Sequence, residues 1–185
     1  FIIGIKGMTH PRTAVRGNII SAWGMLLAVV VALLANGLSY TWILVGALIG
    51  TAVGAIAAYR VQMTQMPEMV ALFNGFGGAA SVLVAGAAFM TAQAPGLQMT
   101  IATGVSGLIG AVTFTGSLIA FLKLAEKIPS GSLGFPGMKV FNGFLGLLAL
   151  GAIGWLAVDP SSQVAFWVVV ALSSVLGVTL TIPIG

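Results

Sequence analysis

The sequence predicts an all-α fold, a polytopic bundle of transmembrane helices with about six full spans and a truncated helix end at the N-terminus. Of the 185 residues, 59% are hydrophobic and only 5% are charged, and the mean hydropathy is +1.14. These values lie outside the range of soluble globular domains. Apolar stretches of roughly 17 to 25 residues recur along the chain, and each can cross a hydrocarbon core about 30 Å thick.

The spans are separated by short breaks, which set their expected bounds. They are predicted at 18–35, 42–59, 66–90, 97–122, 138–158 and 162–182. The first residues, FIIGI, are apolar but too short to span, so we expect them to be the tail of a helix. The chain stops at TIPIG without a polar tail, so residues 1–185 are expected to be an incomplete transmembrane domain of a longer polypeptide.

The formal net charge of +4 could indicate a nucleic-acid partner, but the positions of the charges argue against it. Basic residues occur only before the first span, after the second, and between the fourth and fifth: Lys6, Arg12, Arg16, Arg60, Lys123, Lys127 and Lys139. The loops near 36–41, 89–97 and 158–162 contain no Lys or Arg. By the positive-inside rule the basic loops are cytoplasmic, and the charge reports topology.

Small residues mark the faces where helices approach each other in a bilayer. In the second span Gly46, Gly50 and Gly54 recur every fourth residue, a spacing that is typical of close helix packing. Gly77 and Gly78 in the third span are predicted to serve the same purpose.

The fourth span carries a stripe of hydroxyl groups along one face. Thr103, Ser106, Thr113 and Ser117 follow a helical spacing together with Gly110. Each hydroxyl could bond back to the preceding turn of its own helix. Alternatively, four hydroxyls on one face indicate a hydrated seam.

The third span places polar side chains among its glycines. Asn74 and Ser81 share one face, and Glu68 follows Pro67 in the first turn. For Asn74 the alternatives are an interhelical hydrogen bond and a place in a proton route; for Glu68 they are an N-terminal cap paired with Arg60 and the mouth of such a route. His10 is expected to be a solvated loop residue.

Enzyme motifs are missing from the sequence. There is no dinucleotide fingerprint after a strand, no Walker loop, and no cluster with metal-ligand spacing. The chain has no cysteine, which removes disulfides and thiolate metal sites. We therefore expect no cofactor-binding residue and no metal in this chain.

Three segments carry a family resemblance: GMTHPRTAVRGN (7–18), QMTQMPEMVALFNGFGGAASVLV (62–84) and GAVTFTGSLIAFLKL (110–124). Together and in order they resemble the membrane domain of the beta subunit of proton-translocating NAD(P) transhydrogenase. The resemblance implies a homodimeric, multi-pass enzyme of the cell inner membrane that also has an alpha subunit. That enzyme couples hydride transfer between NADH and NADP+ to proton movement.

The resemblance also implies roles for the parts of this chain. NADP(H) and NAD(H) would bind in soluble domains outside residues 1–185, which would form the proton-translocating domain and carry no hydride-transfer site. Asn74 stands where many relatives have a histidine that handles protons. Ser117 matches a family serine on the neighbouring helix, and Glu68 matches the acid of the MPE motif. The proton pathway is thus predicted to include Asn74, Ser117, Glu68, Thr113, Ser106 and Ser81.

Two other classes of protein remain as alternatives. A secondary transporter would be signalled by matched broken helices in two halves, and the pattern of residues 61–86 has no second copy here. A structural membrane anchor of a larger complex would explain the glycine stripes but would leave the hydroxyl face without a purpose.

Overall fold

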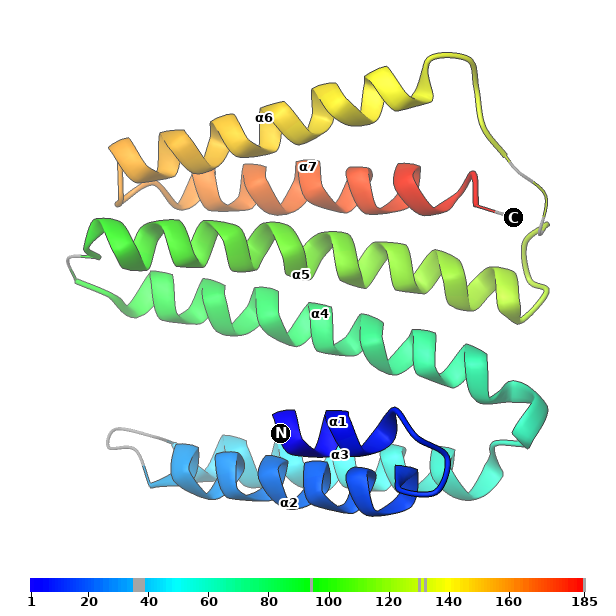
Figure 1. Ribbon diagram of the computed structural model, residues 1–185. Coiled ribbons are helices and arrows are strands. Elements are labelled where there is room, and N and C mark those ends of the chain that lie inside the picture. Colours follow the sequence, from blue (N-terminus) through cyan, green and yellow to red (C-terminus); the bar gives the residue numbers. More distant parts are fainter. Residues whose placement is uncertain (35–38, 94, 130, 132, 185) are drawn as a thin grey trace. The chain divides into compact units, whose positions relative to one another are not determined.

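The computed structural model describes residues 1–34, 39–93, 95–129, 131 and 133–184. Within them the chain forms helices and no strand (Figure 1). The α-helices are α1 (Ile2–Met8), α2 (Ala14–Leu33), α3 (Tyr40–Arg60), α4 (Met66–Thr91), α5 (Leu97–Leu124), α6 (Met138–Val158) and α7 (Gln163–Thr181), with a 3-10 turn η1 (Met63–Gln65) before α4. Six of the described helices are long and apolar enough to cross a membrane. The predicted all-α, multi-pass fold class is confirmed.

The predicted spans agree closely with the helices. The span at 138–158 coincides with α6, whereas α2 begins at Ala14 instead of residue 18. The extra turn of α2 contains Arg16. The helix begins earlier than predicted because a helix can extend past the apolar stretch that marks a span in the sequence. The loops predicted near 36–41 and 89–97 fall in part on residues outside the described ones.

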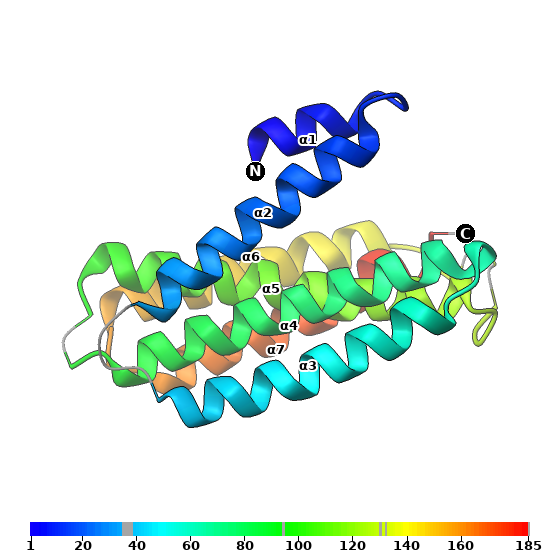
Figure 2. The same ribbon diagram turned by 90° about the horizontal axis from the view of Figure 1, so that it is seen from below.

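The chain divides into two compact units, Phe1–Tyr59 and Arg60–Gly185. In the first unit α1 folds back on α2 (Figure 2). Their contact is made through glycine: a Cβ added at Gly17 would lie 2.6 Å from the carbonyl oxygen of Gly4. The apolar N-terminal segment is therefore a short helix held against α2. Helix α3 contains no buried residue.

The second unit is a layer of four helices in the order α4, α5, α7 and α6 (Figures 1 and 2). Its core lies where α7 packs against α5 and α6. Phe166 is fully buried there with Leu156 and Val169, and its ring stacks on that of Phe89 with the ring centres 5.8 Å apart. This core fixes α5 in the middle of the layer and leaves one edge of α5 for α4.

Helices α4 and α5 touch through their backbones at Gly78 and Gly110. A Cβ added at Gly78 would lie 2.6 Å from the carbonyl oxygen of Gly110, and one added at Gly110 would lie 2.7 Å from that of Gly78. No side chain fits between the two helices at this point. The crossing therefore depends on glycine at both positions, as expected for close helix packing in a bilayer.

The C-terminal end of α5 is closed by a Schellman motif. The backbone N–H of Lys127 donates to Leu122 O at 2.8 Å, and that of Glu126 donates to Lys123 O at 3.1 Å. Glu126 takes the left-handed position with φ of 55°, where glycine is usual. An L-residue in this region is strained, and a carboxylate near the C-terminus of a helix opposes the helix dipole.

Replacing Gly78 with alanine should destabilise the second unit, because the new methyl group must push two backbones apart. We expect a loss of about 1 to 3 kcal/mol, the usual cost of overpacking. The matched control is Gly77→Ala, since no atom beyond the neighbouring backbone of its own helix lies within 4 Å of a Cβ placed at Gly77. Thermal unfolding in detergent measures both variants. Equal melting temperatures would contradict the backbone contact.

Replacing Glu126 with glycine should stabilise the protein by about 1 kcal/mol, because glycine adopts the left-handed conformation without strain. Glu126→Gln is the control, since it removes the charge and keeps the strained backbone. Thermal unfolding should rank the glycine variant above the glutamine variant. Equal melting temperatures for the two variants would show that charge, and not backbone conformation, dominates at this cap.

Candidate functional site

A hydrogen bond joins the polar faces of α4 and α5. The Asn74 Nδ2 atom donates to Ser117 Oγ at 2.8 Å. The two residues are 43 positions apart in the chain, so the close approach of the helices at Gly78 and Gly110 brings them together. The side chain of Thr113 lies at the same contact, with its Cβ 2.9 Å from the position of a Cβ at Gly78.

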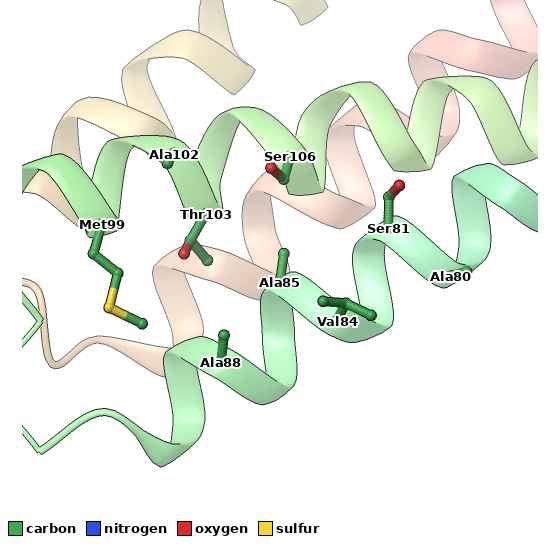
Figure 3. Close-up of a pocket in the computed structure, with 9 residues that line it drawn as sticks. All are labelled: Ala80, Ser81, Val84, Ala85, Ala88, Met99, Ala102, Thr103 and Ser106. Atoms are coloured by element: carbon green, nitrogen blue, oxygen red, sulfur yellow. The ribbon is translucent and has the colours of Figure 1, made fainter. Parts of the chain in front are cut away.

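A cavity of about 450 Å³ extends from the same side of the helix pair toward the other end of α4 and the start of α5. Figure 3 shows Ser81 on α4, and Thr103 and Ser106 on α5, on facing turns with alanines between them. We define the polar seam as the side chains of these three residues and of the hydrogen-bonded group: Asn74, Ser81, Thr103, Ser106, Thr113 and Ser117.

The hydroxyls of the seam differ from several other hydroxyls in the same unit. Thr115, Ser174 and Thr181 each donate to the carbonyl oxygen four residues earlier, at 3.0, 2.8 and 2.9 Å. Within the described residues, the only side-chain hydrogen bond of the seam is the one between Asn74 and Ser117. Back-bonding therefore does not use up the seam hydroxyls, and they can bind water.

The seam lies on a face of α4 and α5 that α6 and α7 leave uncovered. In this unit Asn74, Ser81 and Ser106 are exposed, Thr113 and Ser117 are half-buried, and Thr103 is buried. Polar side chains within membrane spans almost always face protein or water, because contact with lipid is costly. The seam is therefore a surface that needs a polar neighbour.

Glu68 does not belong to the seam. It is half-buried in the first turn of α4, next to Pro67 at the helix start, where a carboxylate is favoured by the helix dipole. The expected ion pair with Arg60 does not form in the described structure. Along the helix axis Glu68 is six residues, or about 9 Å, from Asn74.

The glycines predicted to pack behave differently from one another. Gly78 lies tightly against α5, whereas added Cβ atoms at Gly77, Gly46, Gly50 and Gly54 would have no atom within 4 Å beyond the neighbouring backbone of their own helix. Packing at these four glycines stays a prediction.

Sequence reasoning missed the position of Lys123. Its place in the chain marked it as one more basic loop residue, but it lies in the last turn of α5, is only 9% exposed, and donates to three carbonyl oxygens. The available signal was its spacing of seven residues from Gly116, which places both on one face of α5.

The described part of the chain contains neither a cluster of metal ligands nor a dinucleotide-binding fold. No three His, Asp or Glu side chains gather there, and all regular elements described are helices. A dinucleotide fold needs a strand followed by a glycine-rich turn and a helix. The described residues thus do not fit a nicotinamide nucleotide, and no chemical step through one is assigned to them.

The helices and the polar seam define a class of multi-pass membrane proteins with a hydroxyl-lined contact between two spans. Comparison with known proteins narrows that class, since the family model of the NAD(P) transhydrogenase beta subunit matches residues 1–185. This chain belongs to the NAD(P) transhydrogenase beta subunit family.

Curated relatives agree with this assignment. Two proteins named NAD(P) transhydrogenase subunit beta, both from Rhodospirillum rubrum and one of them from strain ATCC 11170, are each 34% identical to the chain over 194 aligned residues. Each alignment covers 100% of this chain and 42% of the relative. The chain thus spans less than half the length of these relatives.

Proposed function

We propose that this chain is the proton-conducting transmembrane domain of an NAD(P) transhydrogenase. The observation that carries the proposal is the hydrogen bond between Asn74 and Ser117, which joins the polar faces of two spans. The unbonded hydroxyls of the seam support it, because they extend the polar surface from this bond along the cavity beside Ser81 and Ser106. Membership of the transhydrogenase beta subunit family indicates the reaction with which proton movement would be coupled, the transfer of hydride between NADH and NADP+.

The proposed route holds a chain of water molecules. An amide both donates and accepts hydrogen bonds, and a hydroxyl does the same, so Asn74 and the seam hydroxyls can orient water in either direction. Asn74 has no proton to release near neutral pH, so protons would pass through the water and not through its side chain. Glu68 would lie at the cytoplasmic mouth of the route, next to the start of α4.

The complete enzyme would add parts that this chain lacks. We infer an alpha subunit as partner, a second copy of this chain in a homodimer, and NADP(H) and NAD(H) bound outside residues 1–185. The name subunit beta, which the relatives carry, supports a partner subunit, and the 42% coverage of these relatives supports further parts outside residues 1–185. The enzyme would lie in the cell inner membrane with the basic loops on the cytoplasmic side, as the positive-inside rule favours.

Asn74→Leu should reduce coupled proton transport roughly tenfold or more, because leucine binds neither Ser117 nor water and leaves the half-buried Ser117 hydroxyl without its partner, a loss of about 1 to 3 kcal/mol. Proton uptake by liposomes that contain the complete enzyme measures the effect. Asn142→Leu is the matched control, since Asn142 is an amide on α6 outside the seam that donates to Thr179 O at 3.3 Å. Wild-type coupling in the Asn74 variant would reduce Asn74 to a packing contact and move the route elsewhere.

Asn74→His should remain active and gain a new pH dependence. Imidazole titrates near pH 6.5, so the variant would carry a charge on the seam at low pH and lose it as the pH rises through about 5 to 8. The measurement is proton uptake against pH for the variant and the wild type. Identical pH profiles would place residue 74 outside the proton route.

A further inference from the structure

Lys123 is a buried cation that the proton route does not use. Its ammonium group donates to the carbonyl oxygens of Ile182, at 2.6 Å, and of Ile184, and more weakly to that of Gly131 at 3.4 Å. An ammonium has three N–H donors, so these three acceptors satisfy it completely. We call Lys123 and these three carbonyl groups the latch.

The latch contains no carboxylate. The chain has only three acidic residues, Glu68, Glu126 and Asp159, and none of them forms an ion pair with Lys123 in the described structure. The positive charge is instead balanced by main-chain dipoles, two of which belong to the residues that follow α7. Cations are favoured at helix C-termini because the last carbonyl groups there carry partial negative charge.

The contacts of Lys123 are unusual for a lysine near the end of a transmembrane span. Such side chains normally extend into water at the membrane surface. Lys127 and Lys139, in the same region of the chain, are exposed, whereas Lys123 is 9% exposed. Burying an ammonium is costly unless it is fully bonded, so the latch needs all of its acceptors in place.

The latch joins the end of α5 to the segment through which the chain leaves α7. Figure 1 shows both ends on the same side of the second unit. Residues 181–184 form a turn in which Ile184 N donates to Thr181 O at 3.1 Å. At the end of α7, next to this turn, α5 and α7 touch closely, since a Cβ added at Gly116 would lie 2.8 Å from Thr181 Oγ1. Ser117 is the next residue along α5.

We propose that Lys123 is a positioning residue that connects the polar seam mechanically to the segment leaving α7. A pull on residues 182–184 would act through the ammonium on the last turn of α5, about 9 Å along the helix from Ser117. The latch thus provides a path by which parts of the protein that follow α7 change the contact between Asn74 and Ser117. This inference rests on the proposed function, in which that contact belongs to the proton route.

The test uses the complete enzyme in liposomes and measures the ratio of protons taken up to hydride transferred. Lys123→Met keeps the apolar stem and removes the donors, and it should lower this ratio by about threefold to tenfold, the range seen for residues that carry coupling. Hydride transfer in detergent, where no gradient forms, should stay within about twofold of the wild type because the latch lies outside the nucleotide sites. Lys123→Arg keeps the charge and N–H donors and should restore most of the ratio.

The rate of hydrogen exchange at the amides of Ile182 and Ile184 measures directly how firmly the latch holds the turn after α7. Exchange should become about tenfold faster in Lys123→Met, since the carbonyl groups of this turn lose their common donor. Lys127→Met is the matched control, an exposed lysine four residues away, and should change neither measurement. If Lys123→Met does not assemble, Lys123→Gln, which loses the charge but keeps two N–H donors, is judged by the same two measurements.

The outcomes separate the latch from the proton route. A wild-type ratio and wild-type exchange in Lys123→Met would overturn the latch, and so would an equal loss of coupling in Lys127→Met. If Asn74→Leu leaves the ratio unchanged while Lys123→Met speeds exchange at residues 182–184, the proposed route is wrong and the structural connection stands. If Asn74→Leu lowers the ratio and Lys123→Met alters nothing, the route stands without the latch.

Discussion

The polar seam depends on one contact between the backbones of two helices, at positions where both residues are glycine. At Gly78 and Gly110 the backbones of α4 and α5 approach so closely that a methyl group on either would meet a carbonyl oxygen of the other at 2.6 or 2.7 Å. Only this approach allows the short side chains of Asn74 and Ser117 to meet at 2.8 Å. A wider spacing would leave an amide and a hydroxyl without partners in an apolar medium, which is costly.

The bilayer explains why the polar groups of this protein fall into two sets. Some hydroxyls bond to their own helix, as those of Thr115 and Thr181 do, and the helix surface there becomes less polar. The seam hydroxyls of Ser81 and Ser106 make no such bond in the described structure, although their helices provide the same carbonyl groups. Their availability distinguishes a surface that can hold water from one that only packs.

The basic residues show a similar division. Most of the basic residues are exposed and can act through the positive-inside rule alone. Lys123 is buried, and its charge is balanced by carbonyl groups that come from a segment about 60 residues later in the chain. A charge that sets topology can be moved along a loop at little cost, whereas a charge that bonds to a particular turn cannot.

The sequence alone indicated a membrane as the surroundings of the chain, the number of spans, and the polar faces of the third and fourth spans. Bilayer thickness demands about 20 apolar residues per span, and a helix of fixed pitch places Asn74 and Ser81 on one face and Thr113 and Ser117 on another wherever the helices lie. The tertiary structure decided which faces meet, that Gly78 is the glycine of α4 that meets Gly110, that no ion pair joins Arg60 to Glu68, and where the ammonium of Lys123 goes. Periodicity is a property of one helix, but a contact depends on the distance between two backbones and on the directions of carbonyl groups far away in the chain.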